Sequence, residues 1–521
     1  MIPRSSRFCW LLITLLGCAH DVVAAAPETG ADGRKPGATV SKLWGEGGEE
    51  WIEAGRLPDF SYAGYHSGEA SIPDYPVAAD VTTFGAKGDD DVDDTAAFKA
   101  ALAATERGAI FVPPGRYIIS AVLRITKSGV VLRGAGTERT TLFFPKPLQA
   151  IEPNMGATTS GTTTSNYSWS GGFVRLQGDF RSTGLTAITA GAKRGDRVIT
   201  VAKPETLRVG QKIEVKVSDT KEDTLAKHLY AEDAGDISKL GGKTATSLVT
   251  RITAINGKAV TLERALRFDV RAEWQPAVRA FNPTVADSGV EDVAFEFPNT
   301  PYGGHFSEQG FNPVAFAGVS DCWARRLKFV NADSGPMVAG FFNTVSDVVY
   351  ESQRAPDKDG NQGHHGIYLG GNGDHLFTRF DLRMKFVHDI SASHSAGVVV
   401  SEGKGVDLCF DLHKRAPYEI LYTAIDLGKG TRPWRSGGGA ALGKHGGARV
   451  TFWNVRAAGP LAVPPENYLP ASAVNLVGVE LKGGPGVTEP AGIWREAGTA
   501  AGVEPQDLYA AQLARRLAGK K

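Results

Sequence analysis

Histidine, arginine and tyrosine side chains are concentrated late in the chain, and these residue types transfer protons and bind acidic groups. Five histidines fall between positions 364 and 394 and two more follow them: His364, His365, His375, His388, His394, His413 and His445. Histidine titrates close to neutral pH, and tyrosine can donate a proton, so such a set suits general acid–base catalysis. This segment is where we expect the chemistry of the protein.

The string around His413 fits the needs of β-elimination on a uronic acid. That reaction requires a cation for the carboxylate, a base for the C5 proton and an acid for the leaving oxygen. Residues two apart on a strand face the same side, so Asp411 is expected beside His413. The predicted catalytic residues are Asp411, His413, Arg415, Tyr418 and Tyr422.

Two glycine-rich stretches supply candidate substrate-binding residues. His364 and His365 lie between glycines, which allow a ligand or backbone to approach closely. Arg432, Trp434 and Arg435 precede a Ser-Gly-Gly-Gly run, where the indole can stack on a sugar and arginine can pair with a carboxylate or sulfate. A plain structural loop explains the second stretch equally well.

Two other functions remain open. A glycoside hydrolase needs two carboxylates about 5–9.5 Å apart, for which Asp411 with Asp381 or Asp426 is available. A non-catalytic glycan-binding surface protein would use the same polar residues for binding alone.

No metal-ligand set is predicted. The sequence contains no HExxH and no CxxC pair, and adjacent residues such as His364 and His365 point in opposite directions on a regular strand. The acidic run from Asp89 to Asp94 lacks the glycine and terminal glutamate of a calcium loop and is expected to form a turn and a helix cap. Calcium in a substrate groove is left open as a cofactor.

The elements that position these residues begin at Val81. Asp94 or Thr95 is expected to cap a helix with Phe98 and Leu102 on one face, ended by Gly108. Short strands at 109–112, 117–120 and 130–133 follow, separated by proline and glycine turns.

The turn FGAKGD, the helix start DDT and the strand-turn VPPGRY together resemble the opening of the pectate-lyase-3 superfamily, which includes polysaccharide lyases, β-helical glycoside hydrolases and uronan epimerases. The resemblance covers Val81 to Gly136 and implies an all-β fold, a right-handed parallel β-helix with an N-terminal capping helix. It carries no active-site residues over, because no catalytic pattern of that superfamily matches this chain residue by residue.

The rest of the chain divides into segments with different sequence patterns. From Ser288 short apolar strands recur, and the spacing from Val293 through Trp323 and Val348 to Phe377 is about 25–30 residues, as in a β-helix whose coils carry loops. Residues 183–268 alternate apolar and polar positions around an Asn256-Gly257 turn, which predicts a small antiparallel β insertion. The expected layout is signal peptide 1–26, N-terminal wrap 27–78, β-helix start 79–182, β insertion 183–268, β-helix continuation with the candidate groove 269–460, and C-terminal cap 461–521 with a helix over 505–517.

The N-terminus predicts export. Arg4 and Arg7, an apolar stretch and the small residues at 24–26 have the layout of a secretory signal, which indicates a secreted or periplasmic protein. Lipidation of Cys18 is the alternative. After residue 26 only Cys322 and Cys409 remain, and whether they pair is open. No later stretch has the roughly 18 apolar residues that a membrane span requires.

Charge limits the partners. With 57 basic and 57 acidic side chains, no overall field attracts nucleic acid, so an anionic polysaccharide would have to be bound by a local basic cleft. Taken together, the sequence predicts a polysaccharide lyase acting on a uronic-acid-containing glycan outside the cytoplasm, in an oligomeric state that is left open.

Overall fold

The computed structural model describes residues 37–484, 486–499 and 501–520. The predicted signal peptide and Cys18 lie outside these residues. Within them, no helix has the length and apolar character needed to cross a membrane.

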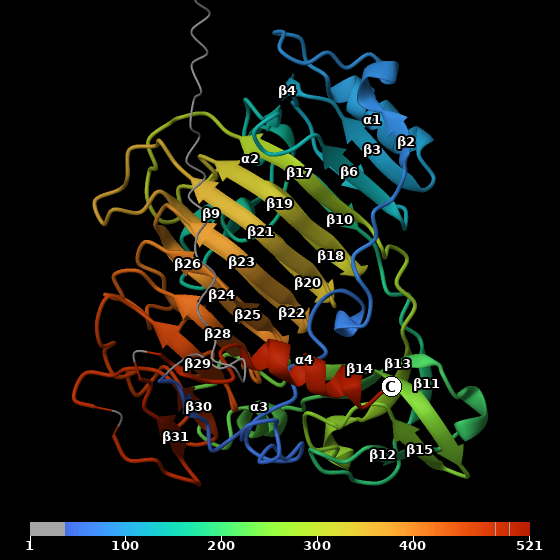
Figure 1. Cartoon of the computed structure of the whole chain (residues 1–521). Coiled ribbons are helices and arrows are strands. Elements are labelled where there is room, and N and C mark those ends of the chain that lie inside the picture. The colour runs from blue at the N-terminus through green and yellow to red at the C-terminus, as the bar shows by residue number, and fades with distance from the viewer. Residues whose placement is uncertain (1–36, 485, 500, 521) are drawn as a thin grey trace, which may run out of the picture.

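Two parallel sheets form the body of the molecule, and the chain passes from one to the other and back in each coil (Figure 1). The long sheet follows the order β2 (Val77–Asp80), β3 (Gly108–Val112), β6 (Val130–Gly134), β17 (Gly289–Glu296), β19 (Trp323–Val330), β21 (Thr344–Glu351), β23 (Leu376–Leu382), β25 (Val399–Ser401), β28 (Leu421–Asp426), β29 (Thr451–Arg456), β30 (Val474–Val477) and β31 (Ile493–Glu496). The second sheet follows the order β5 (Leu123–Ile125), β10 (Val174–Gln177), β18 (Val314–Ser320), β20 (Met337–Phe341), β22 (Gly363–Gly373), β24 (Phe386–Ala396) and β27 (Phe410–Leu412). The protein is therefore a right-handed parallel β-helix, as expected.

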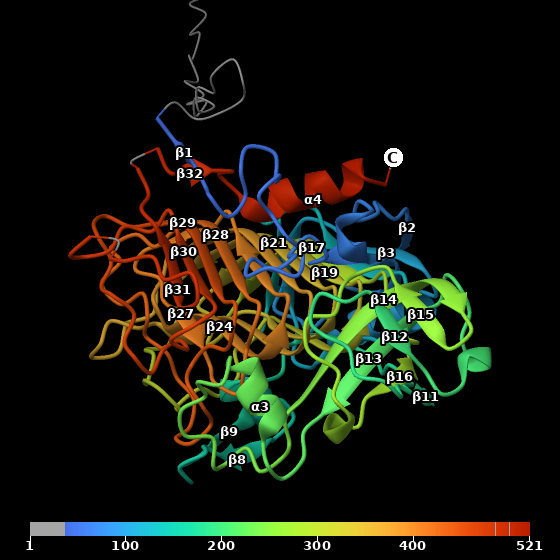
Figure 2. The ribbon, with the colours of Figure 1, turned by 90° about the horizontal axis from the view of Figure 1, so that it is seen from below.

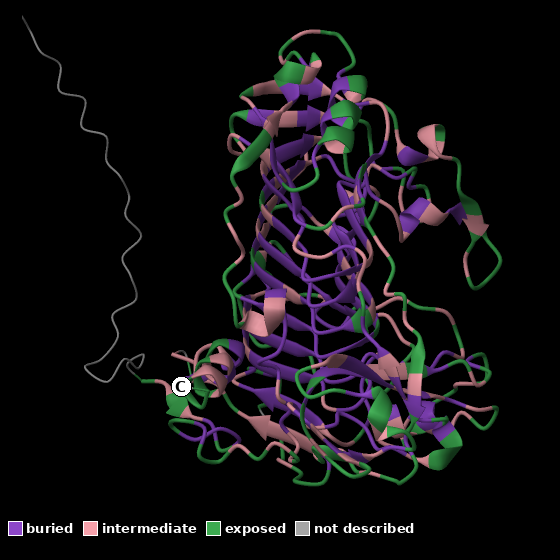
Figure 3. Cartoon of the chain, turned by 90° about the vertical axis from the view of Figure 1, so that its right-hand side faces the viewer, coloured by how far each residue is buried: buried purple, intermediate pink, exposed green. Residues whose placement is uncertain are grey.

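Stacked apolar side chains fill the space inside the coils, and Figure 3 shows the ribbon of the stacked strands coloured as buried along the length of the stack. In the long sheet Val293 pairs with Leu327, Leu327 with Val348, and Val348 with Phe380. The coils are thus 34, 21 and 32 residues long, so the repeat is less regular than the predicted spacing because different coils carry loops of different length. The stacking register, rather than a constant period, keeps the buried positions aligned.

The expected helix is α1 (Thr95–Ala104), which lies at the first end of the stack beside β2 and β3 (Figure 1). Phe98 and Ala101 are buried with the coil interior, and the Phe98 ring lies 5.6 Å from that of Tyr117. The Asp94 side chain accepts a hydrogen bond from Lys87 N, whereas the first-turn amide of Thr95 donates to Asp93. The acidic run therefore forms the predicted turn, with Asp93 taking part in the capping.

The antiparallel insertion is a six-stranded sheet in the order β11 (Gly184–Ala187), β16 (Ala277–Ala280), β13 (Lys212–Ser218), β14 (Ala245–Asn256), β15 (Ala259–Leu262) and β12 (Val198–Thr200). Gly257, with φ of +57°, forms the tight turn between β14 and β15. The sheet extends past residue 268, because β16 pairs with both β11 and β13. A short helix, α3 (Thr224–Leu229), belongs to the same unit.

The two ends of the described chain pack together on the outer face of the long sheet. Strand β1 (Thr39–Val40) pairs with β32 (Val503–Glu504), and helix α4 (Leu508–Ala518) contacts the aromatic N-terminal wrap. Phe60 N, for example, donates to Gln512 Oε1 at 2.8 Å. Strand β31 continues the coil stack, and α4 covers a side of the long sheet. The C-terminal segment, which was expected to form an end cap, therefore contributes strands to the stack as well. Cys322 and Cys409 are both buried and unpaired.

Figure 2 shows β1, β32 and α4 on one side of the stack and β8 (Met155–Ala157), β9 (Thr163–Ser165) and α3 on the other. The second side carries the candidate site.

Candidate functional site

A cavity of about 740 Å³ lies against the outer face of the second sheet. Its floor comes from β22, β24 and the residues after β27, and its walls come from the 157–169 segment, the loop that precedes β18 and the glycine-rich loop at 437–439. The insertion contributes Lys239. Segments distant in sequence therefore meet at one opening.

Histidines from successive coils line this cavity because equivalent positions of neighbouring coils stack in register. His365 pairs with His388, and their ring centroids are 5.2 Å apart. His413 lies 5.4 Å from His388, and His305 lies 4.6 Å from His364. These five imidazoles thus share one surface, and His394 lines the same cavity.

The expectation that His364 and His365 point in opposite directions is wrong. Both line the cavity, and their rings stack with centroids 4.1 Å apart. At this point β22 bonds to non-strand residues, with His364 N donating to Asp333 O and Gly335 N donating to His365 O. On its other edge β22 keeps a regular parallel register, with His365 paired to His388.

Asp411 anchors the cluster from below. Its side chain is fully buried, and its Oδ2 accepts from Ser391 Oγ at 2.6 Å and lies 2.8 Å from His413 Nδ1. Because Ser391 donates to Asp411, it accepts from His365 Nδ1 at 2.7 Å. The resulting chain from His365 through Ser391 and Asp411 to His413 holds two imidazoles with Nδ1–H inward, which leaves Nε2 of each for a ligand.

The pKa values of the side chains in the cluster are shifted in different directions. Burial alone would raise the pKa of Asp411, but the imidazoles of His388 and His413 outweigh it and hold that pKa well below its ordinary value. Burial lowers the pKa of His365 and His388. Burial also opposes protonation of His413, yet contact with Asp411 raises its pKa. Imidazoles with pKa values shifted in opposite directions therefore share one cavity.

A second buried carboxylate stands behind the other end of the cluster. Glu308 is 2% exposed, accepts from Ser168 Oγ at 2.9 Å and from the Tyr302 hydroxyl, and lies 3.4 Å from His364 Nδ1. Burial raises the pKa of Glu308, but His364 and Tyr302 reverse the shift and lower it to about 2. Glu308 therefore remains ionised beside His364.

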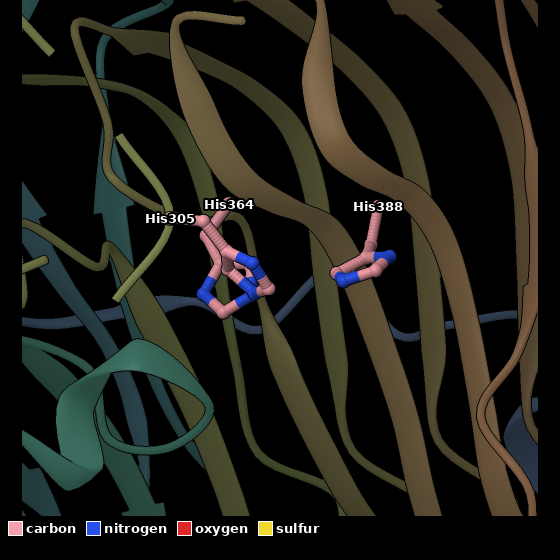
Figure 4. Close-up of side chains that lie close together, drawn as sticks. All are labelled: His305, His364 and His388. Carbon is pink, nitrogen blue, oxygen red and sulfur yellow. The ribbon is translucent and has the colours of Figure 1, made fainter. Parts of the chain in front are cut away.

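Among the described residues, two side-chain groups have the geometry to hold a metal ion. One is His305, His364 and His388, and the other is His388, Asp411 and His413; in each, one candidate ligand atom from every member lies within 4.8 Å of the others. Figure 4 shows His305 and His364 side by side, with one ring nitrogen of His388 turned toward them. Both groups contain imidazole nitrogen, which suits zinc-like metals better than calcium.

The structure brings together four of the predicted residues at the cavity: His364, His365, His413 and Arg415, with Asp411 behind them. Arg415 lies in a turn where Lys414, Arg415 and Ala416 have φ values of +60°, +63° and +55°. Successive non-glycine residues in this left-handed region carry strain of about 1–3 kcal/mol each. The strained turn places Arg415 at the cavity wall.

The structure does not bring the two predicted tyrosines to the cavity. Tyr418 packs with the insertion and shares a hydrogen bond of 2.8 Å with Thr246 Oγ1. Tyr422 is fully buried inside the coil against Phe410 and Phe452. The tyrosine at the cavity is Tyr368, a register neighbour of Ser391 on β22.

The predicted binding residues after position 431 also lie elsewhere. Arg432 donates to Asp389 Oδ2 at 2.7 Å and is mostly buried. Trp434 packs inside the coil, with its ring 5.1 Å from that of Phe452. Arg435 is exposed but is not among the residues that line the cavity.

The aspartates considered for hydrolysis are separated by the fold. Asp381 and Asp426 lie on the long sheet, where they pair with Arg383 and Arg456 at 2.9 and 3.6 Å. Asp411 lies on the second sheet, on the face turned away from the coil interior.

Sequence reasoning missed His305, Glu308, Trp169 and Tyr368. His305 follows Gly303-Gly304, the same glycine-flanked pattern that singled out His364, and could have been found by that signal. No comparable signal marks Trp169, which stands where the cavity meets a second one of about 390 Å³ along β10, β18 and β20. The two cavities share Trp169 and Tyr368, so the binding surface is elongated.

Comparisons with known proteins support the resemblance at the start of the chain. Residues 78–182 match the family model described as rhamnogalacturonase A/epimerase, pectate lyase-like. Comparison with curated proteins returns no match.

Solved structures similar to this chain include the Gp54 tailspike of Acinetobacter baumannii bacteriophage AP22, in complex with A. baumannii capsular saccharide (10% identity, 78% of this chain and 75% of that one, TM-score 0.33). They also include an exopolygalacturonase from Thermotoga maritima (11%, 78% and 82%, TM-score 0.31) and the A-module of the Azotobacter vinelandii mannuronan C-5 epimerase AlgE6 (12%, 76% and 79%, TM-score 0.28). The assignment of the fold rests on the strand pairing described above.

Proposed function

We propose that the protein is an exported polysaccharide lyase that cleaves a uronic-acid-containing glycan by β-elimination. The observation that carries the proposal is the cavity in which His413, held by Asp411, faces the same space as Tyr368 and Arg415. The pectate-lyase-like match at the start of the chain supports a carbohydrate substrate.

The proposed roles follow the order of bond changes. His413 removes the C5 proton, and the electron pair left behind forms the C4–C5 double bond. The C4–O bond breaks, its electrons pass to the leaving oxygen, and Tyr368 protonates that oxygen. The ring centroids of His413 and Tyr368 are 6.4 Å apart. Arg415 stabilises the C5 carboxylate of the substrate while negative charge develops on the sugar.

The shape and charge of the surface favour an anionic chain. The two cavities that meet at Trp169 together give room for more than one sugar, and an indole is suited to stacking on a pyranose face. Lys239 and Arg415 line the first cavity and Arg175 lines the second. Arg175 already pairs with Glu152 at 3.6 Å, so the two cations of the first cavity are the ones that suit an acidic polymer.

The hydrolase alternative lacks the pair of carboxyl groups that it requires at the cavity. No aspartate or glutamate is among the described residues that line the larger cavity. A glycosidase requires two carboxyl groups that reach the scissile bond from the cavity. Proton transfer by imidazole and phenol therefore accounts for the lining better than hydrolysis by paired carboxylates.

The deciding assay follows ultraviolet absorbance of the 4,5-unsaturated uronate while the purified mature protein meets a panel of uronic-acid polysaccharides. We expect absorbance to rise on at least one polymer, and His413→Asn and Tyr368→Phe to lower the rate at least about 100-fold. Asp381→Asn is the control and should keep wild-type activity, because Asp381 lies on the other sheet.

Different outcomes would point elsewhere. New reducing ends without absorbance would identify a hydrolase, and loss of activity in Asp381→Asn would support that reading. Binding that is weakened by Tyr368→Phe, with no cleavage of any polymer, would identify a glycan-binding protein.

A further inference from the structure

We propose that His305, His364 and His388 bind one divalent transition-metal ion of the zinc class, with a coordination position open to the cavity. The three side chains come from the loop before β18, from β22 and from β24, so the coil stack assembles the site from separate segments.

The geometry is close to that of a three-histidine site. One candidate ligand atom from each residue lies within 4.8 Å of the others. Zinc–nitrogen bonds of about 2.0–2.1 Å in tetrahedral geometry place nitrogens about 3.3 Å apart, so a modest adjustment is needed. His305 can supply it, because it is exposed on a loop while His364 and His388 are buried.

Buried carboxylates orient two of the three rings. His364 Nδ1 lies 3.4 Å from Glu308 Oε2, and His388 Nδ1 lies 3.6 Å from Asp411 Oδ2. Among the described residues both Nδ1 atoms are buried without a hydrogen-bond partner, although each lies within ion-pair distance of its carboxylate. A metal-bound histidine commonly turns one nitrogen to such a carboxylate and its other nitrogen to the metal.

The second candidate group, which contains Asp411 and His413, is less suited to a metal. Asp411 Oδ2 already accepts from Ser391 and lies 2.8 Å from His413 Nδ1, and its Oδ1 accepts from Gly437 N. These contacts occupy the carboxylate. In the first group no member donates a ring hydrogen to another, and the three imidazoles can all face one point.

Three imidazole nitrogens favour zinc, cobalt, nickel or iron over calcium and magnesium, which prefer oxygen. Three protein ligands leave a fourth position, and the cavity is where a water molecule or an acidic oxygen of a ligand would take it. If the lyase proposal holds, that oxygen belongs to the uronate carboxylate. The metal site itself does not depend on that proposal.

The test is metal binding without substrate. Protein stripped with a chelator is titrated with Co²⁺, followed by calorimetry and by the visible absorption that distinguishes four- or five-coordinate from six-coordinate cobalt. We expect one ion per chain in the wild type and a loss of affinity of at least about 100-fold in His305→Asn. Glu308→Gln should weaken binding about 10–100-fold, the range found when such orienting carboxylates are changed.

His394→Asn is the matched control, since His394 is also exposed and also lines the cavity but belongs to neither group. It should bind cobalt like the wild type. Absence of stoichiometric binding, or unchanged binding in His305→Asn, would overturn the proposal, as would loss of binding in His413→Asn but not in His305→Asn. Failure of the lyase assay leaves these readings intact, because no substrate is present.

Discussion

At the scale of single residues, the candidate site depends on how closely the glycine-rich loop covers the histidines. Gly437 N donates to Asp411 Oδ1 at 2.7 Å, which ties this loop to the carboxylate below the cluster. A Cβ at position 437 would lie 2.6 Å from His413 Cε1 and 2.8 Å from His388 Cε1. Only a residue without a side chain fits while both rings keep their positions.

We therefore expect Gly437→Ala to displace His413 and His388 and to lower the activity of the proposed lyase at least about tenfold. Misplacement of catalytic groups by about 1 Å can cost about 100-fold, so a tenfold loss is a conservative expectation. Initial rates and thermal unfolding of the variant give the measurement. Gly459→Ala is the control, because a Cβ there meets nothing within 4 Å, and full activity of Gly437→Ala would contradict the packing argument.

At the scale of elements, helix α4 is held at its N-terminus by a carboxyl in an unfavourable setting. Asp507 Oδ1 accepts from Tyr509 N at 2.9 Å, as a helix cap does. Burial nevertheless raises the pKa of Asp507 to about 6. A carboxyl with a higher pKa in the folded than in the unfolded state costs stability as the pH rises through that interval.

Asp507→Asn should therefore stabilise the protein by about 1–2 kcal/mol at pH 8 and leave it no more stable than the wild type at pH 4. Asparagine caps helices as well as aspartate does and carries no charge to bury. Urea denaturation of both proteins at the two pH values provides the comparison, and the low-pH pair serves as its internal control. Equal or lower stability of the variant at pH 8 would show that the charge is well solvated.

At the scale of the whole molecule, a buried ion cluster joins the insertion to the coils. Arg264 donates two hydrogen bonds of 3.0 Å to Asp374, Arg267 pairs with the same carboxylate, and all three side chains are at most 6% exposed. Arg267 also lies 3.5 Å from Glu419 Oε2 on the coil side. The insertion supplies Lys239 to the cavity, so its docking bears on the site.

Asp374→Asn should destabilise the protein by about 3–5 kcal/mol, because it leaves two buried guanidinium groups without their shared charge. Asp347→Asn is the matched control: Asp347, like Asp374, has φ of +56° and pairs with an arginine, Arg379, but the side chains of Asp347 and Arg379 are 36% and 53% exposed. It should cost less than about 1 kcal/mol. Chemical denaturation measures both, and a similar small effect for the two variants would mean that the cluster contributes little to docking.

Much of the architecture could be predicted from the sequence because it depends on local pattern. The recurring short strands with their glycine and proline turns predicted the coils, the Asp-rich helix start predicted α1, and the period-two alternation around Asn256-Gly257 predicted the β14–β15 turn. All of these patterns are set by neighbouring residues. The same alternation correctly placed Asp411 beside His413, since both belong to one short stretch of chain.

Tertiary structure alone decided which distant residues meet. His305, Glu308 and Trp169 reach the cavity from loops whose position depends on the register of the coils, and no local pattern encodes that register. It also decided the faces of Tyr422 and Trp434, which were expected outside and lie within the coil. The sequence by itself thus determined the recurring strands and the histidine-rich segment, with the parallel β-helix implied by the resemblance of residues 81–136. The stacking of unequal coils determined the composition of the site, because a one-residue slip in the pairing register of a strand turns its side chains to the opposite face.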